Sequence, residues 1–135
     1  MKFTDTRGRE HSIDIRPSRW QRKAVGEGRG KFQSLVGDIL AELYPNDVIC
    51  EEFPCSGDNL ALDFFLPRKN IAVEVQGRQH HEFVAFFHGD KEGFTRQRGR
   101  DSRKSEWCDI NGIRLIKIDT GEERENIIKL ILDRD

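Results

Sequence analysis

The stretch at residues 60–76, LALDFFLPRKNIAVEVQ, contains two apolar segments separated by a short polar turn. Residues 60–66 and 71–76 are rich in aliphatic, β-branched and aromatic side chains, which favour strands. Residues 67–70, Pro-Arg-Lys-Asn, have the composition of a tight turn, because proline fixes φ and asparagine tolerates left-handed backbone. The stretch therefore predicts a β-hairpin, and this hairpin decides how the rest of the chain can be arranged.

The length of the turn fixes which residues of the two strands lie opposite each other. Four turn residues place Leu66 opposite Ile71, and counting back along both strands places Asp63 opposite Glu74. The Cβ atoms of directly opposed residues lie about 5 Å apart. Side chains alternate along a strand, so Gln76 shares the face of Glu74. The hairpin therefore predicts two carboxylates and one amide gathered on one face of a sheet.

Two carboxylates at this spacing repel each other unless a positive charge lies between them. A hard divalent cation such as Mg²⁺ takes oxygen ligands from one or two carboxylates together with substrate phosphate. The alternative is a pair of solvated acids on an edge hairpin. The apolar residues that flank Asp63 and Glu74 predict strands buried on at least one face, where unpaired acids are costly. We therefore favour a site for Mg²⁺, or Mn²⁺, at these two residues.

Hydrophobic periodicity extends the hairpin into an α/β domain. The further elements that we expect are a helix at residues 30–44, strands at 48–53 and 113–118, a basic helix at 94–111 and an amphipathic helix at 122–132. The last helix should turn four residues inward, namely Ile127, Ile128, Ile131 and Leu132. A helix separates the fourth strand from the three-strand meander, so this strand should join a central strand in parallel. The fold class is thus a mixed four-stranded sheet flanked by helices.

The composition is that of one folded domain with a polar lead-in. The chain has 135 residues, of which 36% are hydrophobic and 35% charged, which is enough apolar content for one core. We expect residues 1–29 to form a basic, irregular arm and residues 30–135 to form the domain. No apolar run approaches the roughly 20 residues of a membrane span, and the polar start MKFTDTRGRE is unlike a signal peptide. These features predict an intracellular, cytoplasmic protein with no membrane partner.

Cysteine usage predicts the same compartment. The chain has three cysteines, an odd number, without a secretory signal, so reduced thiols are expected. A zinc site that combines cysteines with histidines such as His80, His81 or His88 is the alternative, but the spacing fits no compact ligand pattern. We favour buried or half-buried free thiols at Cys50, Cys55 and Cys108.

The net charge of −1 conceals two basic blocks. Residues 1–34 carry nine Lys and Arg against four Asp and Glu, and residues 91–104 carry six against two. Two basic blocks in a near-neutral chain are typical of a protein with one anion-binding face, although solvated charge runs would give the same counts. We expect nucleic-acid contacts from seven basic residues: Arg29, Lys31, Arg78, Arg96, Arg100, Arg103 and Lys104.

Residues 63–76 contain an Asp, ten further residues and then Glu-x-Gln. This pattern resembles the signature of the PD-(D/E)XK nuclease superfamily, with Gln76 where lysine usually stands. The expected order of helices and strands is also similar to the restriction-endonuclease-like core of that superfamily. Residues 63–81, DFFLPRKNIAVEVQGRQHH, most resemble the very-short-patch repair endonucleases and the EDxHD homing endonucleases. Two later segments also look like that branch, RDSRK at 100–104 and NGIR at 111–114. The resemblance covers about residues 30–119.

The resemblance implies a role for each matching residue of the hairpin. Asp63 is the central metal ligand and Glu74 the second ligand, with the Val75 carbonyl as a further candidate. Gln76 orients a water molecule or holds the phosphate, but it cannot act as an ammonium group. The repair enzymes have no acid at the position of Glu74, so this chain combines features of two site designs.

Residues outside the hairpin complete the implied site. His81 matches the catalytic histidine of the repair and homing branch, which serves as general base or protonates the leaving oxygen. Asp101 matches the final acid, which orients the histidine or binds metal through water. Both residues have a plainer interpretation as polar surface residues. The first-helix acid of the superfamily falls near Gln33, which leaves Gln33 itself, Asp38 or Glu42 as candidates for that position.

These features predict a metal-dependent endonuclease that hydrolyses DNA phosphodiester bonds, of the homing, repair or junction-resolving type. The expected partner is double-stranded DNA, and the expected state is a DNA-associated monomer or homodimer. The alternative is a non-catalytic nucleic-acid-binding module that retains the nuclease fold, favoured by Gln76 and by the missing first-helix acid. A protein-interaction domain is a third hypothesis, for which little in the sequence speaks.

Overall fold

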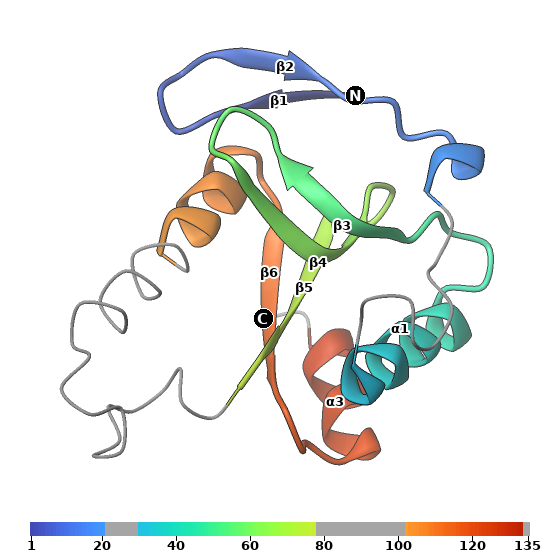
Figure 1. Cartoon of the computed structure of the whole chain (residues 1–135). Coiled ribbons are helices and arrows are strands. Elements are labelled where there is room, and N and C mark those ends of the chain that lie inside the picture. The colour runs from blue at the N-terminus through green and yellow to red at the C-terminus, as the bar shows by residue number, and fades with distance from the viewer. Residues whose placement is uncertain (21–29, 78–101, 134–135) are drawn as a thin grey trace, which may run out of the picture.

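A computed structural model shows an α/β fold built on a four-stranded sheet (Figure 1). The structure describes residues 1–20, 30–77 and 102–133. The elements are β1 (Lys2–Thr4), β2 (Glu10–Ser12), the 3-10 helix η1 (Pro17–Arg19), α1 (Lys31–Leu43), β3 (Cys50–Cys55), β4 (Leu60–Leu66), β5 (Ile71–Gln76), β6 (Arg114–Asp119) and α3 (Arg124–Leu132). A further helix occupies residues 102–110.

The sheet has the order β3-β4-β5-β6 and mixes two directions. β3, β4 and β5 form an antiparallel meander, and β6 pairs with β5 in parallel. Leu66 pairs with Ile71 and Phe64 with Val73, as the four-residue turn predicts. The expected mixed four-stranded sheet, its hairpin register and the parallel placement of the fourth strand are therefore confirmed.

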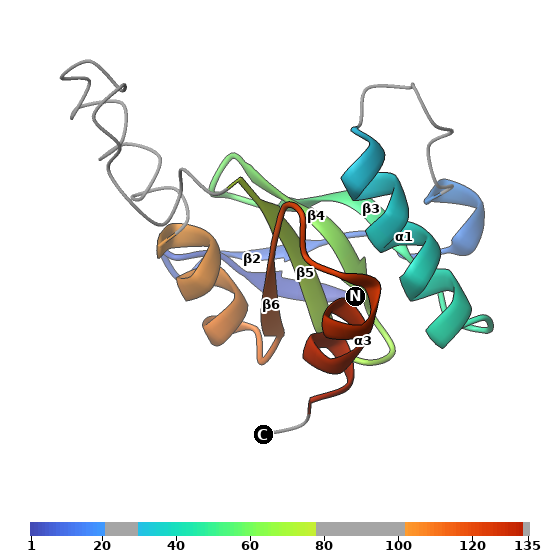
Figure 2. The ribbon, with the colours of Figure 1, turned by 90° about the horizontal axis from the view of Figure 1, so that it is seen from below.

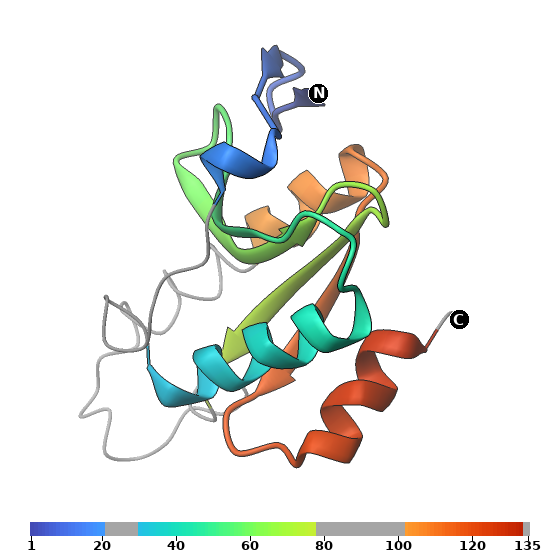
Figure 3. The same cartoon turned by 90° about the vertical axis from the view of Figure 1, so that its right-hand side faces the viewer.

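α1 and α3 lie side by side and cover one face of the sheet (Figures 2 and 3). α1 turns Val36, Ile39 and Leu40 toward the sheet because these residues recur at helical spacing, and α3 does the same with Ile127 and Ile131. Ile49 joins this layer from just before β3, and the strands contribute inward residues of alternate positions: Phe64, Leu66, Ile71, Val73, Ile116 and Ile118. This layer is the first of two cores.

The second core lies on the opposite face, beneath the helix at residues 102–110 and the hairpin of β1 and β2. The helix supplies Trp107 and Cys108, and the hairpin supplies Phe3. The Phe3 ring stacks on Trp107 at 5.3 Å between centroids and meets Phe53 edge-on at 5.4 Å. Both faces of the sheet are therefore covered, and side chains on this second face lie between the sheet and the 102–110 helix.

The N-terminal segment differs from the expected irregular arm. Residues 1–20 contain β1, β2 and η1, and Phe3 is only 2% exposed. The Asn111 side chain donates to the Thr4 carbonyl at 2.9 Å and accepts from the Thr4 N–H at 2.8 Å, so it pairs with β1 as a neighbouring strand would. Two three-residue strands carry almost no local signal, and their stability comes from contacts distant in sequence. Residues 21–29 of the expected arm lie outside the described residues.

The extent of one strand and the orientation of one side chain differ from expectation. β3 begins at Cys50 and continues through Pro54 to Cys55, whereas the expected strand covered residues 48–53. Proline is tolerated here because β3 is an edge strand of the sheet. Leu132 is 46% exposed, which corrects its expected inward position, because it is the last residue of α3 and lies beyond the buried turn at Ile131. Among the described residues, no helix has the length and apolar character that crossing a bilayer requires.

Phe3→Ala should reveal that the N-terminal hairpin belongs to the fold. Removing this ring from the second core is expected to lower the free energy of unfolding by about 3–5 kcal/mol, as for other buried phenylalanines. Urea denaturation monitored by tryptophan fluorescence measures the change. Lys2→Ala, whose side chain is 76% exposed, is the matched control and should change stability by less than about 0.5 kcal/mol. Equal stability of Phe3→Ala and wild type would show that the hairpin is dispensable.

Candidate metal centre

The regular pairing of β4 and β5 ends where their acidic residues begin. The ladder stops at Phe64 and Val73. Beyond it, the Asp63 N–H donates to Glu74 Oε1 at 2.7 Å, and the Val75 N–H donates to Asp63 Oδ2 at 2.8 Å. The two carboxylates take the place of backbone carbonyls, and we call this position, formed by Asp63, Glu74 and Val75, the β4–β5 fork. The expected meeting of Asp63 and Glu74 is therefore confirmed.

The edge strand is also irregular beside the fork. In the register of β3 and β4, Glu52 lies opposite Asp63, and its φ is 54°. A non-glycine residue in this left-handed region costs about 1–3 kcal/mol and persists where the surrounding structure holds it. Regular sheet geometry is therefore interrupted on both sides of Asp63, and such strain is characteristic of functional sites.

The two carboxylates of the fork resist joint ionisation. Burial, and after it the charge of the neighbouring Asp63 carboxylate, raise the pKa of Glu74 to about 7. Lys104 opposes both effects, because its Nζ donates to Glu74 Oε2 at 3.0 Å. Burial also raises the pKa of Asp63, against the hydrogen bond from the Val75 N–H and the charge of Lys104. A divalent cation would relieve this repulsion, so the electrostatics of the fork suit a metal ligand pair.

Gln76 ends β5 on the same face as Glu74. Its backbone carbonyl accepts from the Thr120 N–H at 2.7 Å and from Thr120 Oγ1 at 3.0 Å, which fixes the end of the strand. Its side chain is 5% exposed, yet Oε1 has no hydrogen-bond partner within the described residues. Leaving a buried acceptor unpaired costs about 1–3 kcal/mol. A donor or a cation bound at the fork would remove that cost.

The donor set suits a hard cation. Asp63 and Glu74 supply carboxylates, and Gln76 supplies an amide oxygen that has no partner in the described part of the chain; these are ligand types of Mg²⁺ and Mn²⁺. Within the ranges that the structure describes, no group of three or more His, Cys, Asp or Glu side chains is placed to hold an ion. In the ligand set expected from the sequence, the protein supplies two carboxylates, with the Val75 carbonyl as the further candidate, and water and phosphate would complete the coordination.

α1 reaches β3 beside the fork through Gln33. Its Nε2 donates to Glu51 Oε2 at 3.4 Å, and Glu51 is 6% exposed and close enough to raise the pKa of Asp63. Asp38 is exposed and Glu42 forms an ion pair with Arg124 of α3, whereas Gln33 contacts Glu51 beside the fork. The choice among these three candidates for the first-helix position stays a prediction. Sequence reasoning missed Glu51, whose signal was its place beside Glu52 in a strand with no other charged residue.

Several expected site residues cannot be placed. Those that lie outside the described residues are Arg29, Arg78, His81, Arg96, Arg100 and Asp101. Lys31 and Arg103 are exposed, which suits the expected contact with phosphate. Lys104 is turned inward to Glu74, with 20% of its side chain exposed. It was expected to contact phosphate from the helix surface, and the structure places it at the carboxylates instead.

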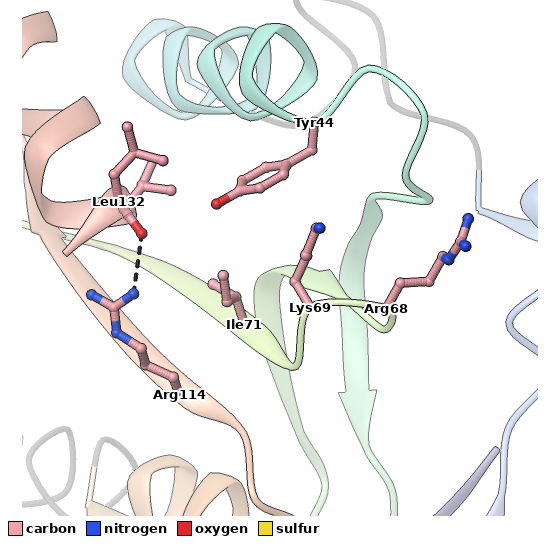
Figure 4. Close-up of a pocket in the computed structure, with 7 residues that line it drawn as sticks. Tyr44, Arg68, Lys69, Ile71, Arg114 and Leu132 are labelled. Atoms are coloured by element: carbon pink, nitrogen blue, oxygen red, sulfur yellow. Dashed lines mark hydrogen bonds between the residues drawn. The ribbon is translucent and has the colours of Figure 1, made fainter. Parts of the chain in front are cut away.

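A hollow of about 410 Å³ opens at the end of β5 opposite the fork (Figure 4). Arg114 lines it and donates to the carbonyls of Leu130 and Ile131 at the end of α3, at 2.9 and 3.1 Å. Lys69 lies over the Tyr44 ring, 5.7 Å from its centroid, at the end of α1. Cations at helix C-termini complement the helix dipole. Helix capping therefore explains these basic residues without a ligand.

The three cysteines are free and buried, as expected. Burial raises the pKa of each thiol to about 12. Cys55 and Cys108 belong to the second core, and neither is paired in a disulfide. Thiols in such surroundings are packing residues rather than nucleophiles.

Comparison with known proteins returns relatives without an assigned function. The chain is 42% identical over 65 residues to uncharacterized protein 033L of Invertebrate iridescent virus 3, which is 48% of this chain and 34% of that protein. It is 38% identical over 60 residues to uncharacterized protein 307L of Invertebrate iridescent virus 6, covering 44% and 30%. It is 36% identical over 81 residues to uncharacterized protein 094L of Frog virus 3, covering 58% and 52%.

The chain thus spans between about a third and a half of the length of these relatives. No protein-family model matches it, and no solved structure matches it.

The raised pKa of Glu74 should make stability depend on pH. The fold favours the protonated acid, so between the ordinary pKa of 4.5 and the folded value of about 7 the folded protein holds more protons than the unfolded chain. The free energy of unfolding should therefore fall as pH rises through this window, in the absence of divalent cations. Glu74→Gln should flatten the dependence. Urea denaturation in EDTA at pH 5 and pH 7.5 measures it.

Glu125→Gln, an exposed acid at the start of α3, is the matched control and should keep the wild-type slope. An unchanged pH dependence in Glu74→Gln would mean that Glu74 ionises freely, and the electrostatic case for a cation at the fork would lapse.

Proposed function

We propose that this protein is a metal-dependent endonuclease that hydrolyses DNA phosphodiester bonds. The observation that carries the proposal is the β4–β5 fork, where Asp63 and Glu74 meet in place of backbone pairing. Gln76 adds a buried oxygen that has no partner within the described residues. Two acids and an amide oxygen on one sheet face are suited to a hard cation and a phosphate rather than to an apolar ligand.

The fold is consistent with a restriction-endonuclease-like core. A helix, a three-strand antiparallel meander, a second helix and a parallel fourth strand follow each other along the chain. The acids lie on the second and third strands of the meander, as they do in the PD-(D/E)XK superfamily that the sequence resembles. We therefore propose membership of that superfamily, with the repair and homing branch as the nearest group.

The two acids of the fork, and Gln76 beside it, each have a chemical role in this proposal. Asp63 and Glu74 would hold Mg²⁺ or Mn²⁺, and the bound ion would lower the pKa of a water molecule and neutralise phosphate charge. Gln76 would accept a hydrogen bond from the attacking water and so orient it. Lys31 and Arg103, which are exposed, would contact the DNA backbone and make binding sensitive to salt.

The second candidate is a nucleic-acid-binding module that retains the fold without cleavage. It is favoured by the ion pair between Lys104 and Glu74, which already neutralises part of the carboxylate charge. It is also favoured by Gln76, which cannot supply an ammonium. Such a module would bind DNA in a salt-sensitive manner and would leave phosphodiester bonds intact in every metal.

A plasmid assay separates the two candidates. Supercoiled DNA incubated with the protein in Mg²⁺ or Mn²⁺ should be nicked, and EDTA should abolish the reaction. Asp63→Asn and Glu74→Gln should each lower the rate by about 100-fold or more, because each removes charge that acts on the reacting phosphate. Asp109→Asn, an exposed acid on the 102–110 helix, should nick at the wild-type rate.

The products carry further information. One site per chain predicts nicked circles from a monomer, whereas linear DNA formed without a nicked intermediate requires two copies acting together. Salt-sensitive DNA binding with no cleavage in either metal would contradict the endonuclease proposal and support the nucleic-acid-binding module.

A further inference from the structure

Among the residues that the structure describes, Lys104 is a cation bonded to the Glu74 carboxylate of the fork. It lies on the 102–110 helix, 30 residues along the chain from Glu74, yet its Nζ is 3.0 Å from Glu74 Oε2. The helix packs on the sheet through Trp107 and Cys108, both fully buried. These residues follow Lys104 by three and four positions, so all three lie on one helical face. Packing of the helix therefore holds Lys104 over the fork.

Two further cations of the described part of the chain, Lys117 and Arg103, are placed differently. Lys117 of β6 pairs with Glu74 in the parallel register, but it is exposed and makes no hydrogen bond or ion pair to a residue that the structure describes. Arg103 is exposed on the surface of the 102–110 helix. Gln76, two residues after Glu74 on β5, carries no charge.

We propose that Lys104 is the ammonium group of this site: it neutralises Glu74 while no divalent ion is bound, and it contacts the scissile phosphate when DNA is bound. The inference rests on the proposed endonuclease function. A flexible ammonium with three donors can exchange a carboxylate for a nearby phosphate oxygen. A helix residue would then supply the positive charge that Gln76 of β5 does not carry.

The phosphate contact has a defined chemical purpose. Hydrolysis forms a bond between the water oxygen and phosphorus and breaks the bond from phosphorus to the leaving sugar oxygen, which takes up a proton. Negative charge grows on the phosphate oxygens and the leaving oxygen as these bonds change. An ammonium held at the fork stabilises that charge and takes no part in the bond changes themselves.

A purely structural ion pair is the competing interpretation, because buried charges need partners whatever their function. The two interpretations differ in what happens when the charge alone is removed. Lys104→Met keeps the length of the side chain without its charge, and Lys104→Arg keeps the charge. Lys129→Met removes an exposed lysine of α3, on the far face of the sheet, and is the matched control.

The first measurement needs no DNA. Wild type and variants are titrated with Mn²⁺ and with Mg²⁺ at pH 9, and thermal unfolding reports the apparent affinity for each cation. Lys104→Met should bind both cations about tenfold more tightly, because a competing positive charge has been removed from Glu74. Lys104→Arg and Lys129→Met should stay within about threefold of wild type.

The second measurement is single-turnover nicking at saturating Mn²⁺, with DNA affinity measured separately in Ca²⁺. Lys104→Met should nick about 100-fold more slowly with little loss of DNA affinity, because its ammonium acts on the reacting phosphate. Lys104→Arg should fall between Lys104→Met and wild type, since a guanidinium keeps the charge with a different geometry. Lys129→Met should nick at the wild-type rate.

The outcomes are separable. Nicking by Lys104→Met at the wild-type rate, or cation affinity in Lys104→Met equal to that of Lys129→Met, would overturn the proposal. If far-UV circular dichroism shows that Lys104→Met does not fold, the test of the proposal passes to Lys104→Arg. Cation binding by Lys104→Arg tenfold tighter than by wild type would then count against the role of charge. If the wild type does not nick DNA, the proposed endonuclease function and the phosphate contact are both wrong. The cation titration still tests Lys104 as the charge partner of Glu74 in that case.

Discussion

Two hydrogen bonds at the β4–β5 fork replace the backbone pairing that the strands would otherwise continue. The Asp63 N–H donates to the Glu74 carboxylate and the Val75 N–H donates to the Asp63 carboxylate. These bonds satisfy backbone donors where the strands diverge, so the sheet can open without leaving buried N–H groups unpaired. The same bonds fix two acids a short distance apart in a partly buried place. The local fold and the candidate metal chemistry therefore depend on the same four groups, which are two backbone N–H groups and two carboxylates.

Coverage of both sheet faces gives this fork its electrostatic character. α1 and α3 close one face, and the 102–110 helix with the N-terminal hairpin closes the other. Burial then opposes ionisation of Glu74, and the helix that contributes to this burial also carries Lys104 to it. A sheet open to water on one face would hold two ordinary surface acids in the same register. The second core is therefore what makes the acid pair chemically unusual.

The sequence was informative where contacts are local. The hairpin register follows from a four-residue turn and from alternation, and it placed Asp63 against Glu74 correctly. Prediction was wrong for the N-terminal segment, since Phe3 owes its burial to Trp107, which lies more than a hundred residues away in the chain. Lys104 was recognised as basic, but its contact with Glu74 depends on how a helix packs, which no local pattern encodes. Glu51 had a local signal as an acid within a strand, but its contact with Gln33 likewise depends on how α1 packs.

The buried thiols described above make this chain convenient for probe attachment. Cys50, Cys55 and Cys108 are enclosed in the core, and burial raises the pKa of each to about 12. Because the thiolate is the reactive form, maleimide dyes and nitroxide labels would not react with these residues in the native protein. One cysteine introduced on the surface would then carry a single fluorophore or spin label without prior removal of the native three. Distances between labelled positions could therefore be followed in the otherwise unaltered protein.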